Sequence, residues 1–151
     1  RVELHLWEAR DFSRVRLHLK HRFTKLEDDS GIGKTFFCDS LRAVLNTWEV
    51  IGDYPVKNKK TNENIDVLLM NGIESMDKSD LRMENTLFII DEADILLTNY
   101  PDMIDSILSN KTSYFLFMLR ADIPGMIFDY YEKAYITHDV SKKLVQMYYY
   151  T

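Results

Sequence analysis

A short run rich in glycine, placed between two regular segments, limits the folds that this chain can adopt. The run Ser30-Gly31-Ile32-Gly33-Lys34-Thr35 follows an extended segment, residues 23–26, and precedes apolar residues at helical spacing. Because glycine has no Cβ, such a run lets several backbone N–H groups converge on one point. A helix that begins at Thr35 directs the positive end of its dipole at the same point. The run therefore predicts a strand, an anion-binding turn and a helix, in that order.

About 50 residues later, a purely apolar stretch ends in two carboxylates. Residues 87–90 have the length of a strand and no polar alternation, which is typical of a strand covered on both faces. Asp91 and Glu92 follow directly, at the end of this predicted strand. Asp91 is a candidate to hold Mg²⁺ through water, and Glu92 to polarise an attacking water as general base. The alternative is a solvated strand end with two surface carboxylates.

The two motifs together predict a site for a nucleoside triphosphate with Mg²⁺. Backbone N–H groups would surround the β-phosphate, Lys34 would bridge β- and γ-phosphate oxygens, and the Thr35 hydroxyl would be a ligand of Mg²⁺. Lys34 is therefore a catalytic candidate beside Glu92. The alternative is an ordinary strand-to-helix turn with a solvated lysine. The residues expected to contact nucleotide are Ser30, Gly31, Ile32, Gly33, Lys34, Thr35 and Phe36.

One position departs from the full phosphate-loop pattern of glycine, four residues, glycine, lysine and serine or threonine. Its first glycine is replaced by Asp28, and Asp29 follows. Aspartate tolerates the left-handed backbone region better than most residues, but it brings negative charge toward a polyanion. A strand at residues 113–119 ends in Arg120-Ala121-Asp122, so Arg120 or Asp122 could sense the nucleotide. An ordinary salt bridge at a strand end is an equal alternative.

Along the chain, segments of strand and helix periodicity alternate, which predicts an α/β fold with a mainly parallel sheet between two layers of helices. We expect one domain over residues 1–151, in which an antiparallel β-hairpin over 1–26 leads into the phosphate loop. Residues 53–64 are predicted to form a surface loop, and Asn99 and Pro101 to start a helix. The other predicted helices cover residues 35–48 and 79–85, and the predicted strands cover residues 2–7, 15–19, 23–26, 65–70, 86–90, 113–119, 134–137 and 144–150.

Composition excludes several classes of protein. The single cysteine, Cys38, rules out an intrachain disulfide and is typical of a reducing compartment, and no apolar run is long enough for a membrane helix. We therefore expect a cytoplasmic protein with no membrane contact. The net charge of −5 does not indicate nucleic acid as partner, although a local basic patch remains open. The run Tyr148, Tyr149 and Tyr150 is interpreted as an edge strand rather than as a platform for stacking bases.

On the two motifs, residues 30–35 and 87–92, the chain resembles the P-loop NTPase superfamily. A strand between the motifs and another after them match the division with an added central strand and an adjacent glutamate, which includes AAA-like and ABC-like ATPase cores. The resemblance implies a sheet of strand order 5-1-4-3-2, ATP with Mg²⁺ as ligand, and hydrolysis at the β–γ bond. The Leu-Ser-Gly-Gly-Gln signature is absent, which argues against an ABC transporter, and no helical lid follows the sheet, which argues against a complete AAA+ module. The guanine-reading motif is also absent, because Asn110-Lys111 is followed by Thr112-Ser113, so ATP is favoured over GTP.

The expected function is that of a small ATP-binding domain, a slow or partner-activated Mg²⁺-dependent ATPase. Its activating residues would come from a protein partner or from self-association. The alternative function is a degenerate P-loop scaffold that binds a protein partner with little or no hydrolysis, which Asp28 and its acidic neighbours favour. A small-molecule kinase is a weaker third hypothesis, because no arginine-rich lid segment is found in the sequence.

Overall fold

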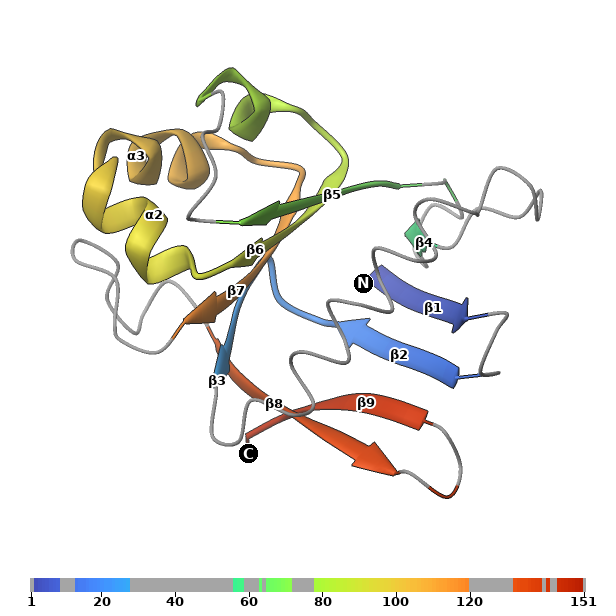
Figure 1. Cartoon of the computed structure of the whole chain (residues 1–151). Coiled ribbons are helices and arrows are strands. Elements are labelled where there is room, and N and C mark those ends of the chain that lie inside the picture. The colour runs from blue at the N-terminus through green and yellow to red at the C-terminus, as the bar shows by residue number, and fades with distance from the viewer. Residues whose placement is uncertain are drawn as a thin grey trace.

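The described strands form a single sheet, and the described helices lie beside it (Figure 1). The structure is a computed structural model. It describes residues 2–8, 13–27, 56–58, 63, 65–71, 78–119, 132–139, 141 and 144–150.

Nine strands form the sheet in the order β4-β1-β2-β9-β8-β3-β7-β6-β5. Helices described by the structure lie between strands β5 and β7 in the chain. The strands are β1 (Val2–Glu8), β2 (Ser13–Leu19), β3 (Phe23–Glu27), β4 (Val56–Asn58), β5 (Asp66–Asn71), β6 (Thr86–Asp91), β7 (Tyr114–Leu119), β8 (Glu132–Asp139) and β9 (Leu144–Tyr149). The helices are the 3₁₀ helix η1 (Lys78–Arg82), α2 (Ala93–Asn99) and α3 (Asp102–Ser109).

Five neighbouring strands at one side of the sheet, β8-β3-β7-β6-β5, are all mutually parallel. Numbered by their order along the chain, they lie in the order 5-1-4-3-2. This is the order that the sequence resemblance implies, and the expected mixed α/β fold with a mostly parallel sheet is confirmed. In such a sheet the carboxyl ends of the strands meet at one edge, so loops after β3 and β6 start from the same side.

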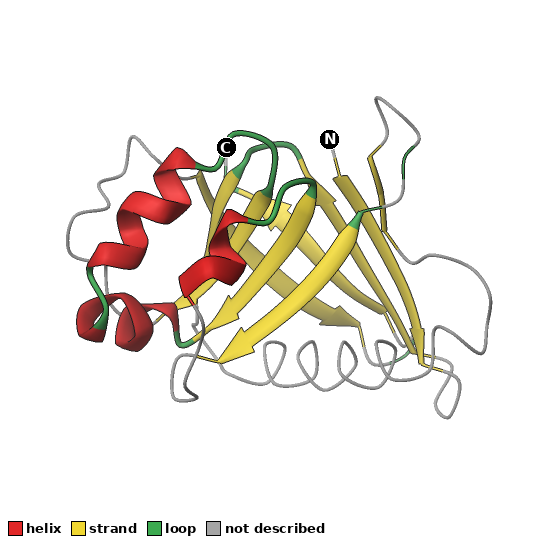
Figure 2. Ribbon diagram, turned by 90° about the horizontal axis from the view of Figure 1, so that it is seen from above, coloured by secondary structure: helices red, strands yellow, loops and turns green. Residues whose placement is uncertain are grey.

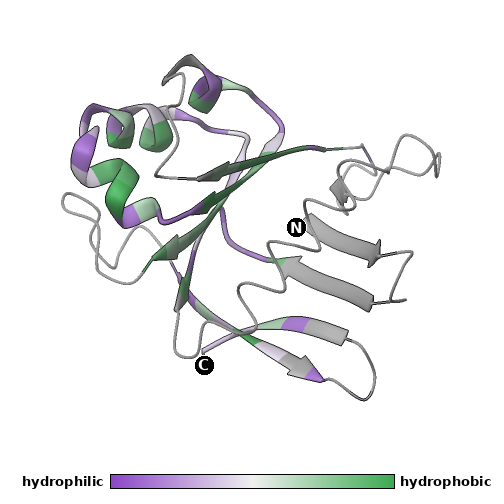
Figure 3. Cartoon of the chain, viewed as in Figure 1, coloured by the Kyte–Doolittle hydropathy of each residue, from purple (hydrophilic) through white to green (hydrophobic). Residues whose placement is uncertain are grey.

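Strands β6 and β7 form the hydrophobic centre of the molecule. Residues 86–90 of β6 are all buried, and so are residues 115–119 of β7. Side chains of a strand alternate between its two faces, so burial at every position means that both faces of the sheet are covered here. The expectation of a doubly covered strand at residues 86–90 is therefore confirmed, and Figure 3 shows the hydrophobic colour of these strands.

The described helices cover one face of the sheet, as Figure 2 shows. Apolar residues of η1, α2 and α3 pack there against Phe88, Phe115 and Phe117. The Phe88 and Phe115 rings are stacked with centroids 4.8 Å apart. The helix that was predicted to begin at Thr35 lies outside the described residues, so a second helix layer stays a prediction.

The first hairpin joins the sheet differently from the expectation. β1 and β2 pair antiparallel as predicted, but β2 then pairs in parallel with β9. The β8–β9 hairpin therefore separates β2 from β3, and β3 is a central strand. The tyrosine run lies in and after β9, which has neighbours on both sides, so the prediction of an edge strand was wrong.

Three local predictions also need correction. Part of the predicted 53–64 loop is strand β4, which pairs with β1, because pairing across the sheet is not visible in a polar sequence. Asn99 is the last residue of α2, and Pro101 occupies the position before α3, so Asn99 does not cap that helix. Helix α2 was not predicted, although the spacing of Ala93, Leu96 and Leu97 is helical, and all three are buried.

Candidate functional site

The predicted carboxylate pair lies at the carboxyl edge of the parallel sheet. Asp91 is the last residue of β6, and Ile90 before it is paired with Phe117 of β7. Phe117 is in turn paired with Lys25 of β3, two residues before that strand ends at Glu27. One strand separates β3 from β6, so their ends are about 10 Å apart. The chain therefore leaves β3 at Glu27 from the same edge of the sheet at which β6 ends in Asp91.

Glu92 has an unusual backbone conformation at the start of α2. Its φ of 52° and ψ of 44° are in the left-handed region, which is costly for a residue with a Cβ. Its N–H donates to Asp91 Oδ1 at 2.9 Å, and its carbonyl accepts from the N–H groups of Ile95 and Leu96. This turn directs the chain from the strand into the helix, and the Asp91 carboxylate is held by the Glu92 backbone.

The Glu92 carboxylate does not cap the helix that follows it. Its Oε2 atom is buried, and in the part of the chain that the structure describes it has no hydrogen-bond partner. A buried carboxylate oxygen without a partner costs free energy, so such an atom is expected to be paired with water or another donor. An oxygen in this position fits the role of a group that accepts a hydrogen bond from an attacking water.

The remaining predicted site residues cannot be placed against this pair. Residues 30–36, with Lys34 and Thr35 among them, lie outside the described residues, and so do Asp28, Arg120, Asp122 and Cys38. Of the predicted site residues, the structure describes the consecutive pair Asp91 and Glu92, and it describes strand β3, which precedes the predicted phosphate loop in the chain. No group of three or more His, Cys, Asp or Glu side chains in the described ranges could hold a metal ion. The Mg²⁺ site that the sequence predicts also requires Thr35, which lies outside the described ranges.

At the opposite edge of the sheet, a buried asparagine connects η1, α3 and β7. The side-chain amide of Asn110 donates to the carbonyls of Leu81 and Met83, both at 2.9 Å. Its Oδ1 accepts from the N–H groups of Thr112 and Ser113 at 3.3 and 3.0 Å. The structural role of Asn110 was not predicted, because in the sequence an asparagine between a helix and a strand is indistinguishable from an ordinary turn residue.

Arg22 connects the start of β3 to the same region. Its guanidinium donates to the carbonyl of Ser113 at 3.1 Å and to the carbonyl of Asn110, and it lies over the Phe23 ring. Burial lowers the pKa of the Arg22 guanidinium from its usual value. This cation therefore has a structural role, because it satisfies carbonyls where α3 ends and β7 begins.

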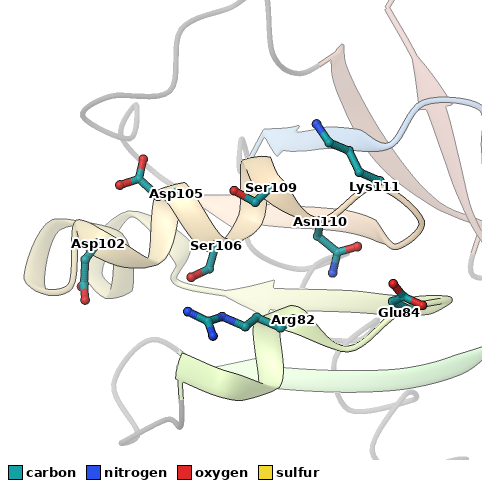
Figure 4. A pocket seen from close by; sticks show the side chains of 8 residues that line it. All are labelled: Arg82, Glu84, Asp102, Asp105, Ser106, Ser109, Asn110 and Lys111. Atoms are coloured by element: carbon teal, nitrogen blue, oxygen red, sulfur yellow. The ribbon is translucent and has the colours of Figure 1, made fainter.

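A polar groove of about 490 Å³ lies along α3 near this edge (Figure 4). Arg82 extends beneath the helix, with Ser106 above it. Acidic, basic and hydroxyl side chains alternate around the groove, so no single ligand charge is favoured. It is lined by Arg82, Glu84, Asp102, Asp105, Ser106, Ser109, Asn110 and Lys111. Most of these residues precede β6 or β7, so the groove is separate from the edge at which Asp91 lies.

No protein-family model and no curated protein matches this sequence. Among the described residues, no helix is long and apolar enough to cross a membrane. The assignment of function therefore rests on the residues and geometry of the chain itself.

Proposed function

We propose that this chain is an ATP-binding domain of the P-loop type that acts as a slow or partner-activated, Mg²⁺-dependent ATPase. The strand order is the observation that carries the proposal. The glycine–lysine–threonine run directly follows the central strand β3, and Asp91 ends β6, with β7 alone between these strands. Two sequence motifs found separately along the chain thus start from the same edge of one parallel sheet.

The Glu92 geometry supports hydrolysis rather than binding alone. Its strained backbone and its buried Oε2, which has no partner in the described residues, are features expected where a carboxylate is reserved for a reacting water. The Glu92 N–H donates to Asp91 Oδ1, which fixes the orientation of the Asp91 carboxylate beside this turn. A surface carboxylate pair with no function would not need either feature.

In the proposed reaction each residue has one role. Lys34 contacts β- and γ-phosphate oxygens of ATP, and the Thr35 hydroxyl and the Asp91 carboxylate hold Mg²⁺ directly or through water. When bound, Mg²⁺ neutralises charge that develops on the phosphates. Glu92 orients a water in line with the γ-phosphate and accepts its proton. A protein partner or a second copy of the chain supplies the cation that completes the site.

Isothermal titration of ATP with Mg²⁺ tests the binding part of this proposal. The wild type is expected to bind in the micromolar range, and Lys34→Ala to lose the heat of binding. If neither protein binds ATP, the ATPase function is excluded, and the scaffold alternative with Asp28 as the disabling residue takes its place.

Turnover of ATP by Glu92→Gln tests the catalytic part. Loss of a general base typically lowers the rate by ~10²–10⁴-fold. The variant is expected to keep its ATP affinity, since the amide is isosteric with the carboxylate. Asp94→Asn is the matched control, because it removes one negative charge two residues further along, in the first turn of α2. Equal phosphate release by wild type and Glu92→Gln would contradict the catalytic role.

A further inference from the structure

Three tyrosines, of which Tyr148 and Tyr150 are exposed and Tyr135 is half-buried, form a cluster on strands β8 and β9 and the residue after β9. Tyr135 and Tyr148 are direct partners across the two strands, with ring centroids 5.7 Å apart and stacked. Tyr150 adds a third ring, 4.9 Å from Tyr135 and tilted. Tyr148 and Tyr150 keep 42% and 47% of their surface exposed. Large aromatic side chains seldom gather on a surface unless they contact a ligand or partner.

The cluster lies on the same face of the sheet as the described helices, but on strands that these helices do not cover. Lys25 of β3 is the register partner of Phe117 in β7 and of Lys133 in β8. Phe117 packs against α2 and α3, so Lys133 and, two residues later, Tyr135 belong to the same face. The opposite face of the hairpin packs into the core through Ala134 and Met147. The tyrosine rings therefore lie on the same sheet face as Phe117, on strands next to those that the described helices cover.

The part of the sheet around this cluster is basic, although the whole chain is acidic. Strands β2, β9, β8 and β3 are consecutive in the sheet and come from residues 13–27 and 132–150. These 34 residues carry eight Lys and Arg against three Asp and Glu, whereas the other 117 residues carry 11 against 21. Arg22 is engaged by main-chain carbonyls and Lys25 is buried, so both add to the local potential rather than to a contact surface.

From these observations we infer that the tyrosine cluster on β8 and β9 is a binding surface for single-stranded nucleic acid. A polyanion is attracted to the basic strands, and planar bases stack on exposed aromatic rings whatever their sequence. Single strands fit better than a duplex, because only unpaired bases present their faces to the rings. An acidic protein segment would use the same charge but would gain little from three aromatic rings. The inference does not depend on the nucleotide site.

Fluorescence anisotropy with a labelled oligothymidylate of about 15 nucleotides tests this surface. The full chain, at low salt, is expected to bind it, and the affinity should fall steeply as salt is raised. The double variant Tyr148→Leu/Tyr150→Leu should weaken binding about tenfold, while Tyr148→Phe/Tyr150→Phe should retain it, because phenylalanine keeps the stacking face. Tyr100→Leu is the matched control, because Tyr100 is equally exposed at 47% but lies at the end of α2.

A second pair of substitutions keeps the inference testable if the leucine variant is poorly folded. Lys142 and Lys143 lie in the chain between β8 and β9. Lys142→Glu/Lys143→Glu should weaken binding and lower the salt dependence, since each lysine paired with a phosphate releases counterions on binding.

Three results would overturn the inference. The first is no binding of the oligothymidylate at low salt, and the second is an unchanged affinity in a folded leucine double variant. The third is equal competition by polyglutamate at matched charge, which would indicate an acidic protein segment as the partner instead. Binding by the wild type that the phenylalanine variant keeps and the leucine variant loses would support it.

Discussion

At the scale of single residues, Glu92 combines two features that each cost free energy. It has a left-handed backbone, and its buried Oε2 has no hydrogen-bond partner among the residues that the structure describes. Asn85 is the other described residue with a positive φ that is not glycine. Asparagine tolerates this region and glutamate does not, so the strain at Glu92 is the more informative of the two.

Glu92→Gly should make the protein more stable by about 1 kcal/mol while removing the carboxylate. Glycine removes both the left-handed backbone strain and the unpaired buried oxygen. The free energy gained in this way is expected to exceed the entropic cost of the greater backbone freedom of glycine in the unfolded chain. Urea denaturation measures the change, with Asn85→Gly as the control that should have an effect close to zero. A Glu92→Gly protein less stable than wild type would show that the carboxylate stabilises the fold.

Asn110 is the polar residue on which the amino edge of the sheet depends most. Asn110→Ala leaves the Leu81 carbonyl and two N–H groups without this partner, while the Met83 carbonyl keeps only the Ser113 hydroxyl, so the free energy of unfolding should fall by roughly 3 kcal/mol. Asn99→Ala, at an exposed position at the end of α2, should change stability by less than about 0.5 kcal/mol. Chemical denaturation of both variants compares them, and similar small effects would mean that water replaces the Asn110 bonds.

At the scale of elements, a tyrosine hydroxyl connects β9 to β3 across the intervening strand β8. Tyr149 Oη lies 2.7 Å from Thr24 Oγ1 and accepts the N–H of Lys20 at 3.2 Å. Burial raises the pKa of Tyr149 above its ordinary value of 10.0, and the hydrogen bond to Thr24 opposes this rise. The hydroxyl therefore holds β9 against β3, the strand that precedes the proposed phosphate loop.

The raised pKa of Tyr149 predicts a loss of stability at alkaline pH. The contribution of the protonated Tyr149 hydroxyl to the free energy of unfolding is complete below about pH 10. It is lost as pH rises through the folded-state pKa, because the unfolded chain releases the phenol proton first. Tyr149→Phe should be less stable than wild type at neutral pH by about 1 kcal/mol, the value of a hydrogen bond.

Above about pH 10 the two unfolding free energies should converge, since the variant has no phenol at this position to ionise. Urea denaturation over a series of pH values measures this difference, and Tyr100→Phe controls for the loss of an exposed phenol. A gap between Tyr149→Phe and wild type that stays constant with pH would contradict the prediction.

At the scale of the whole molecule, the sheet separates two kinds of surface. The parallel strands β7, β6 and β5, with helices on one face, carry the acidic candidate site at their carboxyl ends. The segments that form strands β2, β9, β8 and β3, residues 13–27 and 132–150, have more Lys and Arg than Asp and Glu, and they carry the tyrosine cluster. Strand β3 is the direct neighbour of β7, so a ligand on the basic strands lies close to the strand that precedes the proposed nucleotide loop.

Binding of ATP with Mg²⁺ should stabilise the whole domain. At a ligand concentration of about 100 times Kd, the gain is about 2.7 kcal/mol, which corresponds to a rise in Tm of roughly 5–10 °C for a chain of this size. A thermal-shift measurement is expected to show this rise for the wild type, a smaller one with EDTA and none for Lys34→Ala. Equal shifts in wild type and Lys34→Ala would place the nucleotide elsewhere on the protein.

Several features of the fold could be predicted from neighbouring residues alone. Alternation predicted β1 and β2, a continuous apolar run predicted β6, and Asp91 was expected at its end. Helix α2 could have been predicted from its apolar spacing, whereas strand β4 could not, because it has only three residues, lies within a mostly polar stretch and joins the sheet through β1.

The sequence by itself determined most of the strand segments, although not β4, as well as the residues of the two motifs and the acidic net charge of the chain. These properties depend on each residue and its near neighbours in the chain. Only the tertiary structure decided that β8–β9 separates β2 from β3, that Glu92 has a left-handed backbone, and that three tyrosines meet among basic strands. The reason is physical: adjacency in a sheet is set by pairing between segments far apart in the chain, and many pairings are compatible with the same local pattern.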